Sequence, residues 1–261
     1  YRSEHPEWFD GGCVCGTEGC GWEERPRECW FMPYLPDLNY RNHAVLTQVV
    51  DDTLELLRRF DVDGVRVDAA KHMDHVVMRT LSRRLREDFE AGGGAHIYSV
   101  GETFTGGDGR GTIMEYVSPD ELDGQFDFPL FWTIRSAFAG NATMRDLEGA
   151  MLASRDAYGD AHRSMSPFLG NHDIPRFSTE AAGNGQGAWG DTPDLLADGA
   201  DFVTQWDLVN RQSMAFAFTM TQPGLPLIYY GDEIGLAGDA DPDNRRFMVW
   251  EGRSGNQEEL L

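Results

Sequence analysis

The sequence predicts an α/β fold built on a parallel sheet and preceded by an irregular segment. Short apolar stretches of strand length recur along the chain, and between them apolar residues repeat at helical spacing. Strands that alternate with helices in this way indicate βαβ units, whose strands run parallel. With 261 residues and 41% hydrophobic composition, the chain is long enough for one large domain or two small ones.

The charge balance narrows the classes of partner. Acidic residues number 44 against 22 Lys plus Arg, so the formal charge of −22 repels nucleic acid and anionic membrane surfaces. No apolar run of about 18 residues occurs, so we expect no membrane span. Tyr1 opens a polar stretch without a charged-then-apolar leader, so we expect no signal peptide in this chain. Neutral substrates and cations stay open as partners, and the oligomeric state is not predicted.

The amino-terminal segment, up to about Tyr40, shows no sustained periodicity and holds all four cysteines, at positions 13, 15, 20 and 29. Our first interpretation is two disulfides, which predicts an oxidising compartment, extracellular or periplasmic. Zinc binding is the alternative, although the Cys13-x-Cys15 spacing is tighter than zinc sites usually show. Four cysteines allow three pairings, and the sequence does not choose among them.

The regular elements begin beyond Asn42. Apolar residues recur there at helical spacing as far as Phe60, and a strand follows over residues 63–68. A second helix carries apolar side chains on one face as far as Phe89 and is closed by three glycines. The later predicted elements are strands over residues 97–102, 124–129, 165–170 and 225–231, and helices around residues 144–158 and 203–220. The prediction therefore contains five strands.

The first strand brings a cation and a carboxylate to one face. Successive strand side chains alternate, so Arg66 and Asp68 point the same way. An arginine beside a carboxylate typically lowers the carboxylate pKa by about 1 to 3 units, and Lys71 adds positive potential. This arrangement suits an anionic nucleophile, and a structural ion pair at a strand end is the alternative.

Other predicted strands also end in groups that can do chemistry. They are Glu102, His172 with Asp173, and Asp232 with Glu233. In a parallel barrel the catalytic groups collect at the carboxyl ends of the strands. Carboxylates from three separate strands would then meet on one rim, which indicates a catalytic centre.

These segments, in this order, resemble the motifs of the α-amylase family, family 13 of the glycoside hydrolases, over most of the chain. The matching segments are residues 35–39 (end of the family's inserted domain B), 64–72 (strand 4), 100–102 (strand 5), 168–173 (strand 7), 224–233 (strand 8) and 241–245 (the loop behind it). The resemblance implies a partial (β/α)8 TIM barrel with strands 4 to 8 over residues 42–261. Residues 1–41 would be the C-terminal part of a disulfide-stapled domain B. Because the family's first three strands have no counterpart, we expect an internal fragment of a longer enzyme.

Carried over residue by residue, the resemblance implies a retaining glycosidase. Asp68 would be the nucleophile, Glu102 the general acid and base, and Asp173 the carboxylate that stabilises the transition state. Retention calls for a nucleophile and an acid about 5 to 5.5 Å apart on either side of the scissile bond. Glu102 would have to stay protonated at working pH while Arg66 keeps Asp68 charged.

The same resemblance implies a set of substrate-binding residues, namely Arg66, Lys71, His72, His172, Asp241 and Arg245. The Lys71-His72 pair is typical of α-amylases and cyclodextrin-forming enzymes in this family. We therefore expect cleavage of internal α-1,4 bonds in starch-like α-glucans. The alternatives are an α-glucosidase or glucanotransferase of the same family, or a truncated, non-catalytic glycan-binding relative.

The resemblance also implies a structural calcium. Asp37 and the backbone carbonyl of His72 correspond to two of its ligands. Calcium takes six to eight oxygen ligands, so these two do not complete a site.

Overall fold

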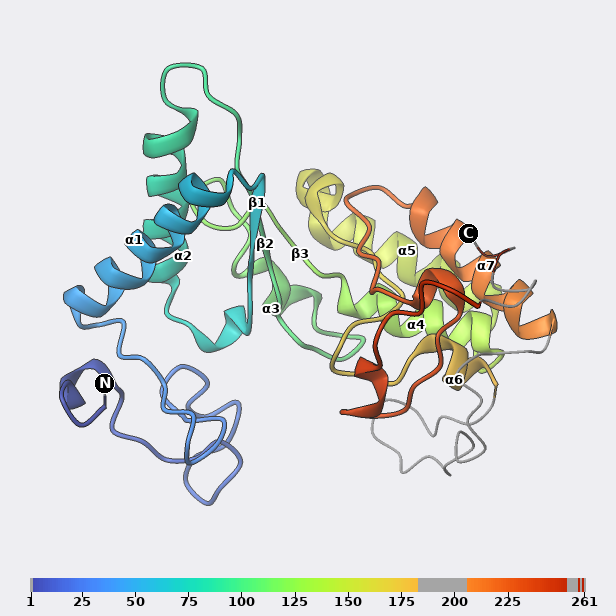
Figure 1. Cartoon of the computed structure of the whole chain (residues 1–261), viewed down its shortest axis with the longest axis horizontal. Helices are drawn as coiled ribbons and strands as arrows, with labels where there is room; N and C mark the ends of the chain where they lie inside the picture. Colours follow the sequence, from blue (N-terminus) through green and yellow to red (C-terminus); the bar gives the residue numbers. More distant parts are fainter. Residues whose placement is uncertain (1, 183–205, 253–257, 259, 261) are drawn as a thin grey trace. The chain divides into compact units, whose positions relative to one another are not determined.

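The structure is a computed structural model that describes residues 2–182, 206–252, 258 and 260. The chain forms two compact units, drawn together in Figure 1 and described here one at a time. The first comprises residues 1–105 and 111–126, and the second comprises residues 106–110 and 127–261. Among the described residues, no helix combines the length and apolarity needed to cross a membrane.

The first unit is centred on a parallel sheet. Strands β1 (Gly64–Val67), β2 (Tyr98–Gly101) and β3 (Gly124–Gln125) lie side by side in that order. All three run parallel, with Val67 opposite Gly101 and Gly101 opposite Gln125. The predicted parallel α/β class is therefore confirmed for this unit.

Helices α1 (His43–Phe60) and α2 (His75–Leu85) pack on this sheet through their apolar faces. Asn42 caps α1 by accepting a hydrogen bond from the Ala44 N–H, and Asp61, the residue after the last turn, has a left-handed φ of 52°. Leu46, Val50, Leu54 and Leu57 recur every three or four residues and are buried. They share one core with Leu81, Leu85, Ile97 and the partly buried Val65. A π-helical turn, Arg86–Glu90, continues α2, and α3 (Arg110–Met114) precedes β3.

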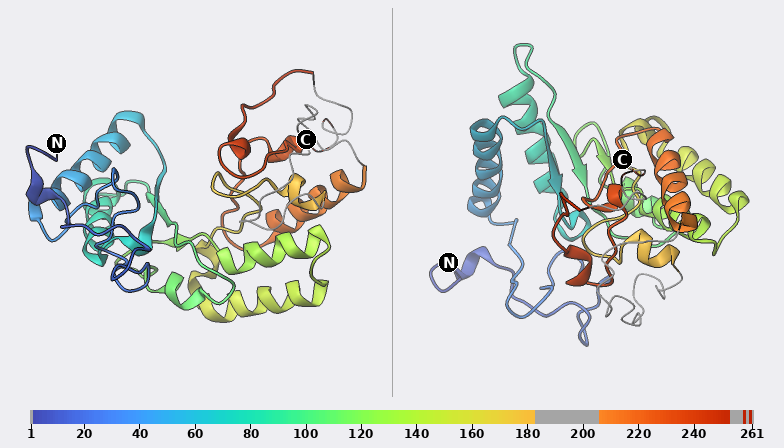
Figure 2. Two further views of the ribbon diagram at one scale, coloured as in Figure 1. Left: turned by 90° about the horizontal axis from the view of Figure 1, so that it is seen from below. Right: turned by 45° about the vertical axis from the view of Figure 1, so that its right-hand side comes forward.

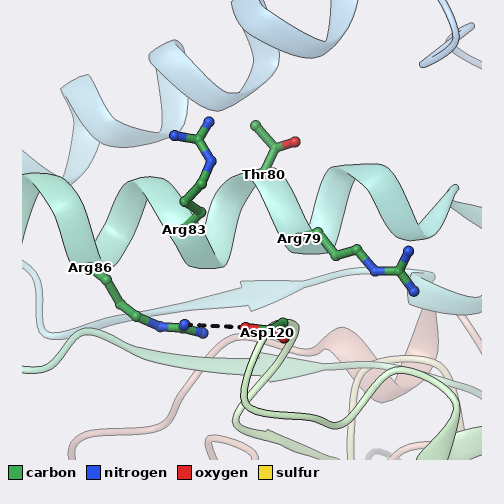
Figure 3. A pocket seen from close by; sticks show the side chains of 5 residues that line it. All are labelled: Arg79, Thr80, Arg83, Arg86 and Asp120. Atoms are coloured by element: carbon green, nitrogen blue, oxygen red, sulfur yellow. Dashed lines mark ion pairs between the residues drawn. The ribbon is translucent and has the colours of Figure 1, made fainter.

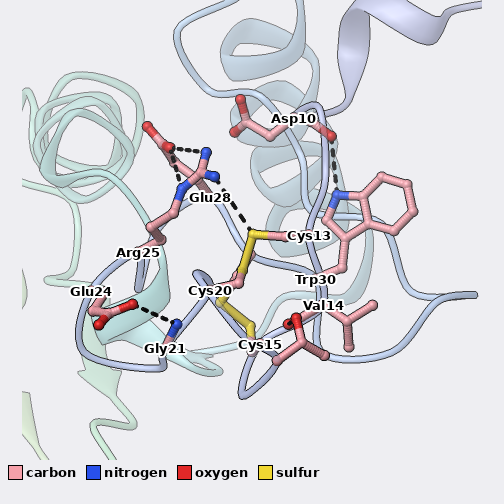
Figure 4. Close-up of a disulfide and its surroundings, with 12 residues drawn as sticks. Asp10, Cys13, Val14, Cys15, Cys20, Gly21, Glu24, Arg25, Glu28 and Trp30 are labelled. Atoms are coloured by element: carbon pink, nitrogen blue, oxygen red, sulfur yellow. Dashed lines mark hydrogen bonds and ion pairs between the residues drawn. A yellow bond between two sulfur atoms is a disulfide. The ribbon is translucent and has the colours of Figure 1, made fainter.

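The amino-terminal segment, residues 1–41, holds two disulfides, which confirms the prediction of disulfide bonds there (Figure 4). Cys13 pairs with Cys20 and Cys15 with Cys29, so none of the four thiols is left for zinc. Apart from the short 3-10 turn Pro6–Trp8, isolated bridges such as Val14 with Trp30 take the place of regular elements here. The Trp30 indole is buried and donates to the Asp10 carbonyl at 3.0 Å (Figure 4).

The second unit is mainly helical. Helices α4 (Phe128–Ala139) and α5 (Met144–Tyr158) form a hairpin that is clearest in Figure 2. Gly140 ends α4 with a φ of 92°, and Thr143 forms a capping box with Asp146 at the start of α5. Helices α6 (Phe177–Ala181) and α7 (Trp206–Thr221) complete a shared apolar core. Residues 203–205 of the predicted helix over 203–220 lie outside the described residues.

The prediction of a strand over residues 124–129 is wrong beyond Gln125. Asp127 caps α4 instead, because its carboxylate accepts a hydrogen bond from the Leu130 N–H at 3.1 Å. Pro129 sits in the first turn of α4, where its missing N–H costs nothing.

The predictions of strands over residues 165–170 and 225–231 are also wrong. In the part of the chain that the structure describes, these segments pair through one isolated parallel bridge, Phe168 with Leu227. The Leu225 N–H donates to the Met165 carbonyl at 3.0 Å. A parallel ladder would return a bond from residue 167 to the Leu225 carbonyl, but Pro167 has no N–H to give. The pairing therefore stays too short for a strand, and three of the five predicted strands form.

Candidate active site

The first unit brings two of the predicted catalytic carboxylates to neighbouring strand ends. Val67 ends β1 opposite Gly101, which ends β2, so Asp68 and Glu102 follow in register. The Glu102 N–H donates to the Val67 carbonyl at 2.8 Å, and the Ala70 N–H donates to the Glu102 carbonyl at 2.7 Å. These backbone hydrogen bonds fix the main-chain positions from which the Asp68 and Glu102 side chains extend.

One guanidinium group contacts both carboxylates. Nη1 of Arg66 lies 2.8 Å from Oδ1 of Asp68, and Nη2 lies 3.1 Å from Oε1 of Glu102. The contact between Arg66 and Asp68 confirms the prediction from strand alternation. The Arg66 guanidinium also lies over the Phe126 ring, 5.7 Å from its centroid. The two acids are thereby held within reach of a single planar cation.

The environments of the two acids differ. The Asp68 side chain is 67% exposed and the Glu102 side chain only 9%. The second Glu102 oxygen, Oε2, accepts a bond from the Ala69 N–H at 3.3 Å. Ala69 has a left-handed φ of 48°, which turns the chain from β1 into the 3-10 turn Ala70–His72. Two nearby carboxyl groups in unlike surroundings are what a division into nucleophile and proton donor requires.

Lys71 and His72 both contact the amino-terminal segment. Nδ1 of His72 donates to the Pro26 carbonyl at 2.7 Å, and its ring meets the Phe31 ring edge-on with centroids 4.8 Å apart. Burial lowers the pKa of His72, which favours the neutral imidazole, and the bond to the Pro26 carbonyl opposes that shift. Nζ of Lys71 lies 3.9 Å from the Glu23 carboxylate. These two residues therefore connect the end of β1 to the disulfide-bonded loops.

The second unit gathers four other predicted site residues. Oδ1 of Asp173 lies 3.4 Å from Nε2 of His172 and 3.4 Å from Nη2 of Arg245. Nε of Arg245 lies 3.2 Å from Oδ1 of Asp241 and donates to the His172 carbonyl at 3.1 Å. Arg245 ends the 3-10 turn Asp243–Arg245. His172, Asp173 and Arg245 are each about two-fifths exposed, so the group is open to solvent.

A buried ion pair supports this group and was missed in the sequence. Nη1 of Arg176 lies 2.8 Å from Oδ1 of Asp232, and both side chains are almost fully buried. Burial raises the pKa of Asp232 to about 6, and Arg176 opposes that shift. Asp232 begins the turn Asp232–Ile234 and was noted as a strand-end carboxylate. No spacing pattern pointed to Arg176 as its partner, because the contact joins segments distant in sequence.

The residues expected to bind calcium fit that ion only in part. Burial raises the pKa of Asp37 to about 7, and the nearby Asp10 carboxylate adds to the shift. A divalent cation would favour the charged form of such a group. Within the described residues, however, no three acidic, histidine or cysteine side chains are placed to hold a metal. Most of the six to eight oxygens would have to be water or backbone carbonyls.

A pocket on α2 holds none of the predicted site residues (Figure 3). Arg79, Thr80, Arg83, Arg86 and Asp120 line it. The three arginines are paired with acids: Arg79 with Glu121 at 2.8 Å, Arg83 with Glu87 at 2.7 Å and Arg86 with Asp120 at 3.7 Å. Their charge is compensated, so we assign no ligand to this pocket.

Comparison with known proteins gives a family match over most of the chain. The model of the alpha amylase catalytic domain matches residues 18–259. A cyclomaltodextrinase from Geobacillus thermopakistaniensis is 31% identical over 231 residues, which are 87% of this chain and 33% of that protein. A cyclomaltodextrin glucanotransferase from Paenibacillus macerans is 29% identical over 217 residues, which are 82% of this chain and 26% of that protein.

A solved structure gives the same result for the fold. The crystal structure of an alpha-amylase from Geobacillus thermoleovorans, complexed with acarbose, superposes with a TM-score of 0.78 at 23% identity. The match covers 98% of this chain and 51% of that one. The chain therefore spans about a third or less of these curated relatives and about half of this solved structure.

Proposed function

The chain belongs to the α-amylase family, and from this membership we propose that it carries the catalytic carboxylates of a retaining α-glucan hydrolase. The observation that carries the proposal is the contact of Arg66 with both Asp68 and Glu102 at adjacent strand ends. Two neighbouring carboxyl groups, one exposed and one buried, support the assignment of a nucleophile and a proton donor.

In the proposed reaction, Glu102 protonates the glycosidic oxygen as the exposed Asp68 carboxylate attacks the anomeric carbon. The C–O bond to the leaving sugar breaks and a covalent glycosyl-enzyme forms. Glu102, now a carboxylate, then takes a proton from a water that displaces Asp68 and restores both groups. Asp173 stabilises the positive charge that develops on the sugar ring in both steps.

The family resemblance assigns substrate binding to five further residues, two in the first unit and three in the second. Lys71 and His72 would contact sugars on the reducing side of the cut, and His172, Asp241 and Arg245 the hydroxyls of the sugar being cleaved. The charge of −22 is compatible with a neutral polysaccharide. We propose internal α-1,4 bonds of starch-like glucans as the substrate.

The proposal extends to the architecture. Residues 1–41 would be the C-terminal part of domain B, and residues 42–261 would form part of a (β/α)8 barrel, with β1, β2 and β3 as its strands 4 to 6. Two disulfides support an extracellular or periplasmic location, because such bonds persist in oxidising compartments. The half-buried Asp37 supports a structural calcium near the His72 carbonyl.

Reducing-sugar release from soluble starch, by the whole protein in the presence of calcium, tests the reaction. The wild type should release sugar and Glu102→Gln should release far less. Products from maltoheptaose then test the mode of cleavage. A mixture of short oligosaccharides from the first minutes supports internal cleavage, whereas glucose alone would point to an α-glucosidase. A whole protein that binds starch but never cleaves it would show a glycan-binding relative instead.

Transfer to another sugar is the second candidate function. The similarity to a cyclomaltodextrin glucanotransferase favours it. Transfer uses the same glycosyl-enzyme, with a sugar hydroxyl in place of water. Products longer than maltoheptaose, or cyclic products, in the same assay would identify it.

A further inference from the structure

The amide of Asn244 binds the backbone on both sides of Asp173. Its Nδ2 donates to the His172 carbonyl and to the Ile174 carbonyl, each at 2.8 Å. Asn244 is fully buried, whereas the Asp173 side chain is 38% exposed. We propose that Asn244 is a positioning residue, which fixes the tripeptide 172–174 so that the Asp173 carboxylate is held for catalysis. The proposal rests on the role given to Asp173 above.

Asn244 is itself held firmly. Its backbone carbonyl accepts bonds from Nε of Arg176 at 3.0 Å and from the Tyr229 hydroxyl at 3.2 Å. Arg176 is 1% exposed and is fixed in turn by Asp232. Gly238 allows the close approach of this turn, because a Cβ there would lie 2.7 Å from Cα of Asn244. The amide therefore extends from a rigid base toward a more exposed segment.

Other contacts to the tripeptide are weaker supports. Nε of Arg245 donates to the His172 carbonyl at 3.1 Å, but that side chain is 44% exposed. The Asp173 N–H donates to Oδ1 of Asn171 at 2.9 Å, which is a contact within the same loop. Asn244 brings the tripeptide a buried support from a segment about 70 residues away in sequence. Removing it should leave the direction of Asp173 poorly defined.

The amide acts here as a donor. Oδ1 of Asn244 has no hydrogen-bond partner in the part of the chain that the structure describes. Burying an unpaired oxygen is unfavourable, so a residue needed only to fill space would be better replaced by an apolar side chain. The two N–H bonds are thus the reason for an asparagine at this place.

Two variants of the whole protein test the proposal, with Ser178→Ala as control. Ser178 is also buried and donates one bond to a carbonyl, that of Leu236, away from the tripeptide. Asn244→Ala should lower kcat about 10- to 100-fold with little change in KM, because about 1 Å of misplacement costs about that much. Asn244→Asp should be impaired at neutral pH and regain activity relative to wild type as the pH falls, because only the protonated carboxyl group can donate.

Ser178→Ala should lower Tm about as much as Asn244→Ala does, but it should keep the wild-type kcat. If Asn244→Ala lowers Tm but keeps wild-type kcat, or if Asn244→Asp shows no recovery in acid, the proposal is overturned. A crystal structure of Asn244→Ala gives a readout that does not depend on the reaction, because Asp173 should move relative to Phe168 and Leu227. An unmoved Asp173 overturns the positioning role. If the wild type has no activity on glucans but Asp173 is displaced in the Asn244→Ala structure, the proposed function is overturned and the positioning role of Asn244 stands.

Discussion

Arg66 of β1 reaches across to Glu102 at the end of β2, with its Nη2 3.1 Å from Oε1, while its Nη1 contacts Asp68. The planar guanidinium presents two nitrogens in a fixed geometry, so it contacts both carboxylates and holds them in a defined arrangement. Arg66 therefore contributes to the orientation of both predicted acids.

Replacing Arg66 with lysine should lower kcat about 10- to 100-fold. The ammonium of lysine is a point charge on a flexible stem and does not hold both acids in the fixed geometry of the guanidinium fork, and a charge-assisted hydrogen bond contributes about 1.5 to 3 kcal/mol. Steady-state kinetics on maltoheptaose would measure this. Arg79→Lys is the matched control, because Arg79 pairs with Glu121 on α2 at 2.8 Å and should keep wild-type kcat. Equal rates for both variants would contradict the bridging role.

Asp68→Asn should remove glucan cleavage by a factor on the order of 10⁴ or more, as the loss of a covalent nucleophile does elsewhere. The side chain is 67% exposed, so Tm should stay within a few degrees of wild type. The rate of starch hydrolysis and a thermal unfolding curve of the variant would measure these two effects. Normal hydrolysis by this variant would sink the assignment of Asp68.

Glu102→Gln should lower hydrolysis of maltoheptaose by about 10²- to 10⁴-fold, the usual contribution of general acid catalysis. The defect should be much smaller in the first step with an α-maltosyl fluoride, because fluoride leaves without a proton. A burst of fluoride release by Glu102→Gln would show that the variant still forms the glycosyl-enzyme. An equal defect on both substrates would argue that Glu102 is not the acid.

Asp37 predicts a pH dependence of stability. Its pKa in the folded state, about 7, is above the ordinary aspartate value of 3.8, so the folded state holds more protons between these two values. The contribution to the free energy of unfolding is present below about pH 4, falls as the pH rises, and is lost above about pH 7. Denaturant unfolding of wild type and Asp37→Asn should show a flatter pH slope in the variant, with EDTA present. Calcium should restore wild-type stability at pH 8 if the proposed ion binds there, and an unchanged slope in the variant would contradict the assignment.

The disulfides should stabilise the segment unequally. Cys15 and Cys29 are 14 residues apart and Cys13 and Cys20 are 7 apart, so the chain-entropy model gives about 3 and about 2.5 kcal/mol. Unfolding of Cys15→Ser/Cys29→Ser and of Cys13→Ser/Cys20→Ser, in the whole protein, would compare them. Limited proteolysis should then cut first within residues 10–30. Full resistance after reduction would show that packing, with Trp30 at its centre, holds the segment without the bridges.

Local patterns carried much of the prediction. The periodicity of Leu46, Val50 and Leu57 indicated α1 correctly, and alternation placed Arg66 and Asp68 together. Helical periodicity and strand alternation depend only on residues that are close together in the sequence, so both patterns can be read from it directly. The extent of the strands was less predictable, because single side chains overrode the apolar pattern. Asp127 begins a helix by accepting a hydrogen bond from the Leu130 N–H, and Pro167 lacks the N–H that a strand pairing would need.

By itself, the sequence determined the parallel βαβ order of the first unit, the presence of two disulfides and the two strand ends at which Asp68 and Glu102 stand. Periodicity, cysteine content and motif order are properties of neighbours along the chain. The tertiary structure decided which cysteines pair, that Arg66 serves two acids, and that Arg176 and Asn244 support the segment around Asp173. Those contacts join residues far apart in sequence, and their partners are chosen by burial and by the geometry of donors and acceptors once the chain has folded.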